Sequence, residues 1–182
     1  MRKRIILLIA ILIAVSLNAC AKEQPDTESQ SNSGTISSGQ ASTFPFTFSA
    51  TDLYENEVTE ASLGEKEVFF VHYWGTWCPP CVAEMPEIAE VAEEYGDRVG
   101  FIALLDDYAD NRQGAVNITE SAGVPFIMID ANTQGLADVL AMLRTGYVPT
   151  TIILDGNGDM IGEAIIGAFG AEYSQFLDAA LD

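Results

Sequence analysis

Two cysteines separated by two prolines, Cys78 and Cys81, stand between a continuous apolar run and an amphipathic pattern. The run Val68–Trp74 is apolar and aromatic almost throughout, as expected of a strand covered on both faces. From Pro80 to Tyr95 the apolar residues keep three- and four-residue spacing, which predicts a helix. At the start of a helix, positions i and i+3 come within reach of the Cα separation of about 5.5–6 Å that a disulfide needs. The sequence therefore predicts a reversible thiol/disulfide pair at a strand-to-helix turn.

The place of this pair favours redox chemistry over a purely structural role. Cys78 faces the unpaired N–H groups of the helix start, and these favour a thiolate. Pro79 and Pro80 are tolerated there because first-turn N–H groups have no intrahelical partner, and they stiffen the turn. The alternatives are an inert disulfide and half of a zinc site. Zinc is poorly supported, because the sequence holds only three cysteines and one histidine.

The rest of the chain alternates strand and helix patterns. Phenylalanines alternate with smaller residues over 44–48, and residues 53–58 surround a turn, which together predict an N-terminal hairpin. Residues 150–154 and 160–166 predict a second hairpin around an Asp-Gly-Asn-Gly turn. Further strands are expected at 99–105 and 124–129, and helices at 110–122, 136–143 and 173–181. This order indicates an α/β sandwich around a mixed sheet.

Two motifs resemble a known family. The run Trp74-Gly-Thr-Trp-Cys-Pro-Pro-Cys-Val-Ala-Glu-Met-Pro86 is similar to the active-site signature of the TlpA/ResA-like thioredoxins, which are extracytoplasmic thiol–disulfide oxidoreductases. The run Val148-Pro-Thr-Thr151, followed by Ile-Ile-Leu-Asp-Gly-Asn-Gly, resembles the family's cis-proline strand and hairpin. The resemblance covers residues 44–182. It implies a thioredoxin-like three-layer sandwich, with helices on both faces of a central mixed sheet, an N-terminal β-hairpin extension and a segment inserted before the cis-proline.

The resemblance also implies roles for individual residues. Cys78 is expected to be the exposed attacking thiol and Cys81 the buried resolving thiol. Pro149 is expected to be cis, so that Val148 offers backbone groups to an extended substrate segment. The pair itself is the redox group, and no further cofactor or metal is expected. The residues expected to contact substrate are Trp77, Pro79, Pro80, Val148 and Pro149.

Two ionisable residues near the pair are candidates for proton transfer. Glu84 lies one helical turn after Cys81, and in the family members that carry it this glutamate assists proton transfer; the alternative is a surface helix glutamate. His72 departs from the family, which usually carries Asn at this position. Thioredoxins carry a buried acid there. It could accept a proton from Cys81, or be a hydrogen-bonded core residue without a catalytic part. The first hypothesis predicts that His72→Asn shifts the pH dependence of thiol exchange.

The N-terminus predicts export. Residues 1–19 combine a basic start with a short apolar stretch, which is typical of a signal peptide. Leu17-Asn-Ala-Cys20 resembles the lipobox of bacterial lipoproteins, in which the cysteine is acylated; the alternative is an ordinary cut after Ala19. Residues 20–43 are then the acylated cysteine and a flexible tether, and 44–182 the redox domain. The domain is expected on the outer face of the cytoplasmic membrane.

The net charge and the family resemblance together limit the kinds of partner that are expected. The net charge of −19 becomes −22 once the three basic residues of the signal are removed, which disfavours nucleic acid. The resemblance implies a membrane-tethered, monomeric reductase of disulfides in exported proteins, such as apocytochrome c or methionine sulfoxide reductases. A CcdA/DsbD-like membrane protein would supply the electrons. Two alternatives stay open, a disulfide-forming oxidase of the DsbA type and a non-catalytic binding lipoprotein. The sequence lacks the cysteine motifs that copper delivery and peroxiredoxin chemistry require.

Overall fold

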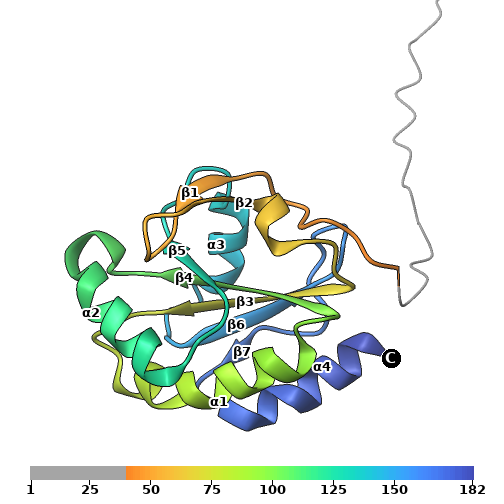
Figure 1. Cartoon of the computed structure of the whole chain (residues 1–182). Helices are drawn as coiled ribbons and strands as arrows, with labels where there is room; N and C mark the ends of the chain where they lie inside the picture. The colour runs from red at the N-terminus through yellow and green to blue at the C-terminus, as the bar shows by residue number, and fades with distance from the viewer. Residues whose placement is uncertain (1–39) are drawn as a thin grey trace, which may run out of the picture. The chain divides into compact units, whose positions relative to one another are not determined.

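The structure is a computed structural model that describes residues 40–182 (Figure 1). The expected signal peptide, the expected lipidation site Cys20 and residues 20–39 of the expected tether lie outside the described residues. Within residues 40–182, no helix is both long enough and apolar enough to cross a membrane. Within these residues, Ser42 forms an isolated antiparallel bridge with Lys66.

A five-stranded mixed sheet forms the centre of the described domain. Its order is β5-β4-β3-β6-β7, in which β3, β4 and β5 are parallel and β6 and β7 are antiparallel to their neighbours. All seven residues of β3 and all seven of β4 are buried, which explains their unbroken apolar sequences. The strands are β3 (Val68–Trp74), β4 (Val99–Leu105), β5 (Ile127–Asp130), β6 (Thr150–Leu154) and β7 (Ile165–Ile166). The expected mixed α/β sandwich is confirmed.

Helices cover both faces of this sheet (Figure 1). On one face α1 (Pro79–Tyr95) and α4 (Tyr173–Leu181) pack on the even-numbered residues of β3, such as Phe70. On the other face α3 (Ala137–Leu143) and the N-terminal hairpin pack on the odd-numbered residues, such as Phe69. Helix α2 (Tyr108–Ala122) lies beside α1 at the end of the sheet that carries the cysteines. The alternation of a strand therefore places His72 on the α1/α4 face.

Both expected hairpins form, but with shorter strands than expected. The first pairs β1 (Ser49–Thr51) with β2 (Glu57–Thr59) in a separate two-stranded sheet, and the 3₁₀ helix η1 (Glu60–Leu63) follows. Phe44 and Phe48 precede β1 and are buried in the core instead of forming a strand. In the second hairpin only a Leu154–Met160 bridge and β7 pair with β6. A second 3₁₀ helix, η2 (Gly170–Glu172), leads into α4.

The four cationic side chains within residues 40–182 are all engaged close to where they lie. Arg98 pairs with Glu67, with Nε–Oε1 at 2.5 Å, and Arg112 pairs with Glu55 at 3.0 Å. Arg112 also donates to the Leu53 carbonyl, which ties the N-terminal hairpin to α2. The other two are Lys66, which donates to the Gly96 carbonyl, and Arg144, which donates to Asn132.

Candidate active site

The two cysteines lie where β3 passes into α1. Cys78 is the N-cap of α1, and its disulfide to Cys81 spans a Cα separation of 5.3 Å. The backbone N–H of Cys81 donates to Cys78 Sγ at 3.3 Å. A sulfur in this position faces the positive end of the helix, so the thiolate of the reduced state is stabilised.

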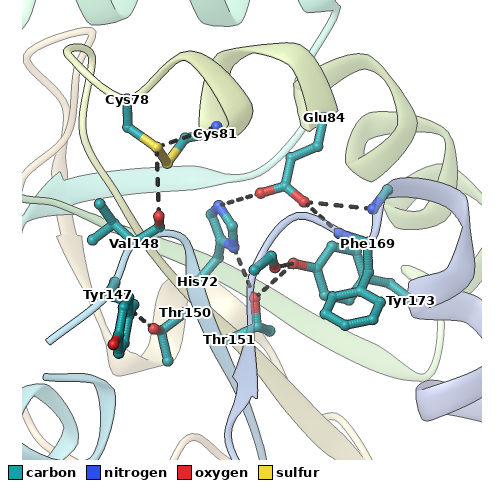
Figure 2. A network of polar contacts seen from close by, with 12 residues as sticks. His72, Cys78, Cys81, Glu84, Tyr147, Val148, Thr150, Thr151, Phe169 and Tyr173 are labelled. Atoms are coloured by element: carbon teal, nitrogen blue, oxygen red, sulfur yellow. Dashed lines mark hydrogen bonds and ion pairs between the residues drawn. A yellow bond between two sulfur atoms is a disulfide. The ribbon is translucent and has the colours of Figure 1, made fainter. Parts of the chain in front are cut away.

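The cis-proline loop covers the outer side of the disulfide. The Val148–Pro149 peptide bond is cis, as expected, and the Val148 carbonyl oxygen lies 3.7 Å from Cys78 Sγ (Figure 2). Cys78 is only 3% exposed and Cys81 is fully buried. The expectation of an exposed Cys78 is therefore wrong for this disulfide form, because the sulfur is packed beneath the loop.

Two exposed aromatic residues are the sequence neighbours of Cys78 and Val148. Trp77 is 58% exposed and directly precedes Cys78, while Tyr147 is 69% exposed and directly precedes Val148. A Cβ atom on Gly75 would lie 2.6 Å from Trp77 Nε1, so the glycine makes room for the indole. Sequence reasoning placed Trp77 at the site but missed Tyr147, although its position before the cis-proline pair was a usable signal. Pro79 and Pro80 are exposed, Val148 is half-buried and Pro149 is buried.

The loop before the cysteines is held by the start of α2. Asp107 accepts the Thr76 backbone N–H at 3.0 Å and also the Thr76 hydroxyl. Asn111 donates to the same hydroxyl oxygen at 2.7 Å, and its backbone is non-helical inside α2. These contacts fix the loop that carries Trp77, and no sequence pattern indicated them.

Glu84 lies behind the disulfide, inside the protein. It is 3% exposed, and its Oε2 accepts the backbone N–H groups of Phe169 at 3.1 Å and Gly170 at 3.4 Å. Burial raises the pKa of Glu84 to about 7, and the donated hydrogen bonds only partly oppose this. A carboxyl group with this pKa can both take up and release a proton near neutral pH. The alternative of a solvated surface glutamate is thereby excluded by the structure.

His72 lies beneath the disulfide and beside Glu84 (Figure 2). Its Nδ1 is 2.9 Å from Thr151 Oγ1, and its Nε2 is 3.6 Å from Glu84 Oε1. Complete burial lowers the pKa of His72 to about 3, so the ring is neutral at physiological pH. Of the two candidates for accepting a proton from Cys81, the structure therefore favours Glu84. A direct part for His72 in proton transfer stays a prediction.

A chain of hydroxyl groups extends from His72 away from the cysteines. Thr151, which pairs with His72 across strands β6 and β3, donates to the Tyr173 hydroxyl at 3.2 Å. Tyr173 donates in turn to the Gly167 carbonyl at 3.3 Å. Tyr173 was expected only as the first residue of the last helix, and no local pattern links it to His72.

Metal binding has no support in the described part of the chain. Among residues 40–182, no three His, Cys, Asp or Glu side chains are grouped so as to hold a metal ion. Within this domain, Cys78 and Cys81 therefore have no further ligands with which to form the zinc site considered from the sequence.

Comparison with known proteins agrees with this geometry. The Redoxin family model matches residues 39–168. The thiol-disulfide oxidoreductase ResA of Bacillus cereus is 34% identical over 122 residues, which are 66% of each chain; the match thus spans just under two thirds of that relative. A thiol:disulfide interchange protein of Chlorobium tepidum superposes with a TM-score of 0.60 at 22% identity, covering 79% of this chain and 98% of its own.

A second solved structure, StoA from Bacillus subtilis, superposes with a TM-score of 0.55 at 18% identity, covering 75% of this chain and 98% of its own. Identities this low speak for the fold alone, and the fold they share is the sandwich described above. The family follows from the Redoxin match together with the ResA relatives. The chain therefore belongs to the Redoxin family and is a ResA/TlpA-like protein.

Proposed function

We propose that this protein is an extracytoplasmic thiol–disulfide oxidoreductase that reduces disulfides in exported proteins. The observation that carries the proposal is the position of Cys78 Sγ, at the start of α1 and 3.7 Å from the Val148 carbonyl of the cis-proline loop. An extended polypeptide that pairs with this loop brings its own disulfide to Cys78. The ResA relative, a thiol-disulfide oxidoreductase by name, supports the same chemistry.

In the reduced protein, the Cys78 thiolate attacks one sulfur of the target disulfide. A mixed disulfide forms and the second target sulfur leaves as a thiolate. Cys81 then gives its proton to the Glu84 carboxylate and attacks Cys78 Sγ. This restores the Cys78–Cys81 disulfide and releases the first target sulfur. Two electrons pass to the target, and the pair of cysteines is the only redox group that the step needs.

The chain's own disulfide must then be reduced again. We propose a CcdA/DsbD-like membrane thiol protein as the donor, and lipidation of Cys20 as the means of holding the domain near it. Acylation of Cys20 would leave Cys78 and Cys81 as a pair without a competing thiol. The targets, of the apocytochrome c or methionine sulfoxide reductase type, are proposed on the family resemblance alone.

The reduction potential of the Cys78–Cys81 couple tests the direction of electron flow. We expect a value near that of thioredoxin, about −270 mV; a value near that of DsbA, about −120 mV, would support disulfide formation instead. The companion assay is reduction of a disulfide-bearing model protein by the wild type, Cys78→Ala and Cys81→Ala. We expect no turnover from Cys78→Ala and a trapped mixed disulfide with Cys81→Ala. A wild type that neither reduces nor oxidises the model protein would point to a binding role.

A further inference from the structure

Two buried polar atoms without hydrogen-bond partners face each other behind the disulfide. Within the described residues three such side-chain atoms occur, and two of them are His72 Nε2 and Glu84 Oε1, 3.6 Å apart. Both side chains are inside the protein, at 0% and 3% exposure. A buried pair of this kind is stable only if one atom carries a hydrogen and the other offers a lone pair.

The hydroxyl chain decides which ring nitrogen of His72 carries its hydrogen. The chain ends at the Gly167 carbonyl, which can only accept, so Tyr173 donates to it. Thr151 donates to the Tyr173 oxygen, and its own oxygen is then left to accept. Nδ1 must therefore be the protonated nitrogen of the neutral ring, because it lies 2.9 Å from that oxygen. The lone pair of Nε2 points toward Glu84.

The contacts of Glu84 decide the other half of the pair. Its Oε2 accepts two backbone N–H groups, from Phe169 and Gly170, whereas Oε1 has no hydrogen-bond partner and lies 3.6 Å from the bare Nε2. An ionised carboxylate would set an oxygen lone pair against a nitrogen lone pair, which is repulsive. A protonated Oε1 instead points an O–H group at an acceptor.

We propose that Thr151 and Tyr173 are positioning residues that hold His72 as its Nδ1–H tautomer, so that the bare Nε2 keeps Glu84 protonated next to the resolving cysteine. The proposal rests on the proposed function, because the stored proton serves the disulfide pair. When a donor thiolate attacks Cys78 Sγ, the sulfur–sulfur bond breaks and Cys81 leaves as a buried thiolate. The proton on Glu84 Oε1 then passes to Cys81, and Glu84 becomes the carboxylate that takes it back in the reverse step.

The other titratable groups near Glu84 act on its pKa in both directions. Glu87, on the same helix, raises the pKa of Glu84 through charge repulsion. Tyr173, from α4, stays neutral because burial raises its own pKa well above 10, and its hydroxyl group opposes the other influences by lowering the pKa of Glu84. The two cysteines form a disulfide and do not titrate. Within the described domain no lysine or arginine pairs with Glu84.

The tautomer can be read directly, because His72 is the single histidine of the chain. The oxidised protein with ¹⁵N-labelled histidine is examined by long-range ¹H–¹⁵N correlation, in which protonated and bare ring nitrogens resonate far apart. We expect a protonated Nδ1 and a bare Nε2 from pH 5 to pH 6, where Glu84 carries its proton. A protonated Nε2 in the wild type overturns the proposal, and this result needs no variant.

Tyr173→Phe tests the hydroxyl chain, with Thr151→Ser as the matched control that keeps a hydroxyl. Without the tyrosine oxygen, Thr151 is free to donate to Nδ1, so His72 should move to the Nε2–H tautomer and donate to Glu84. The pKa of Glu84, followed by ¹³C-carboxyl NMR, should then fall by about one pH unit, the size expected of one hydrogen bond to a carboxylate.

Tyr173 could instead help Glu84 ionise by donating to it, and its loss would then raise this pKa. A raised or unchanged pKa with an unchanged tautomer therefore contradicts the proposal. Should Tyr173→Phe fail to fold, Thr151→Val removes the acceptor of Nδ1–H and gives the same readout. These spectra do not depend on turnover, so a failed reductase assay and a failed tautomer test are distinguishable.

Discussion

Two pairs of side chains near the disulfide, here called the rim and the pocket, differ in exposure and in chemistry. The rim consists of Trp77 and Tyr147, two of the most exposed large apolar side chains in the described domain, which directly precede Cys78 and Val148 in the chain. The pocket consists of His72 and Glu84, which are ionisable and almost completely removed from water. Under the proposed function, one side of the two sulfur atoms meets varied partners, while the other side exchanges a single proton in fixed surroundings.

This difference separates recognition from chemistry. Exposed aromatic side chains can bind different polypeptides through apolar area, and they leave hydrogen bonding to the loop backbone. Buried ionisable groups have pKa values set by the protein alone, because no solvent screens them. A change at the rim should alter which targets react, whereas a change in the pocket should alter the pH at which they react.

The two largest expected effects are in the pocket, on the free energy of unfolding, and the effect of His72 exceeds that of Glu84. Burial raises the pKa of Glu84 from 4.5 to about 7, so the folded protein keeps a proton that the unfolded chain loses above pH 4.5. Stability is therefore lost between pH 4.5 and 7, by about 3 kcal/mol. Glu84→Gln mimics the protonated acid and should remove this loss. Glu93→Gln, at an exposed position of the same helix, is the control.

His72 has the opposite pH dependence. Burial lowers its pKa from 6.5 to about 3, so the unfolded chain gains a proton below pH 6.5 that the folded protein does not take up. Stability is lost as the pH falls from 6.5 to 3, by roughly 5 kcal/mol, and His72→Asn should remove that loss. Between pH 4.5 and 6.5 the two slopes oppose each other in the wild type. Urea unfolding at several pH values measures both, and variant curves parallel to the wild-type curve would contradict these assignments.

A smaller effect is expected at the rim. Trp77→Ala and Tyr147→Ala each remove exposed apolar area, which should raise the KM for a protein disulfide about 5- to 30-fold, equivalent to about 1–2 kcal/mol. Reaction with a small disulfide, which cannot reach across the rim, should change less. Tyr54→Ala, an exposed aromatic of the N-terminal hairpin, is the control. Equal losses with large and small substrates would mean that the rim acts on the chemistry itself.

The smallest effect is expected where the rim is attached to the scaffold. Thr76→Val keeps the shape of the side chain but removes the hydroxyl held by Asp107 and Asn111. The expected loss is about 1 kcal/mol of stability, the usual net value of a hydrogen bond. Thr51→Val, at an exposed position of β1, is the control in the same unfolding measurement. Equal stability of both variants would show that the hydrogen bonds of the Thr76 hydroxyl group contribute nothing to the free energy of unfolding.

The sequence predicted best what depends on local pattern. Strands β3 and β4 begin and end at the residues expected, because a strand buried on both faces needs an unbroken apolar run. The cis-proline and the disulfide follow from motifs. The strands of the N-terminal hairpin are shorter than expected. The alternation of Phe44 and Phe48 was interpreted as a strand, but these side chains pack in the core and their backbone does not pair with a strand.

What the sequence could not give is contact between distant segments. Thr151 and Tyr173 meet His72 only because β6 pairs with β3 and α4 folds back on the same face. The depth of Cys78 was missed for the same reason, since the loop that covers it is 70 residues away in the chain.

All four cationic side chains in the described domain bind neighbouring groups of the same chain, and this affects how copies of the protein repel one another. The chain carries 27 acidic and 8 basic residues, and the cations of the domain are held by their own neighbours instead of being offered to a second molecule. Two copies that approach each other therefore meet like charge on like charge, with a repulsion that reaches about 10 Å in ordinary salt. Many such molecules side by side would therefore space themselves apart.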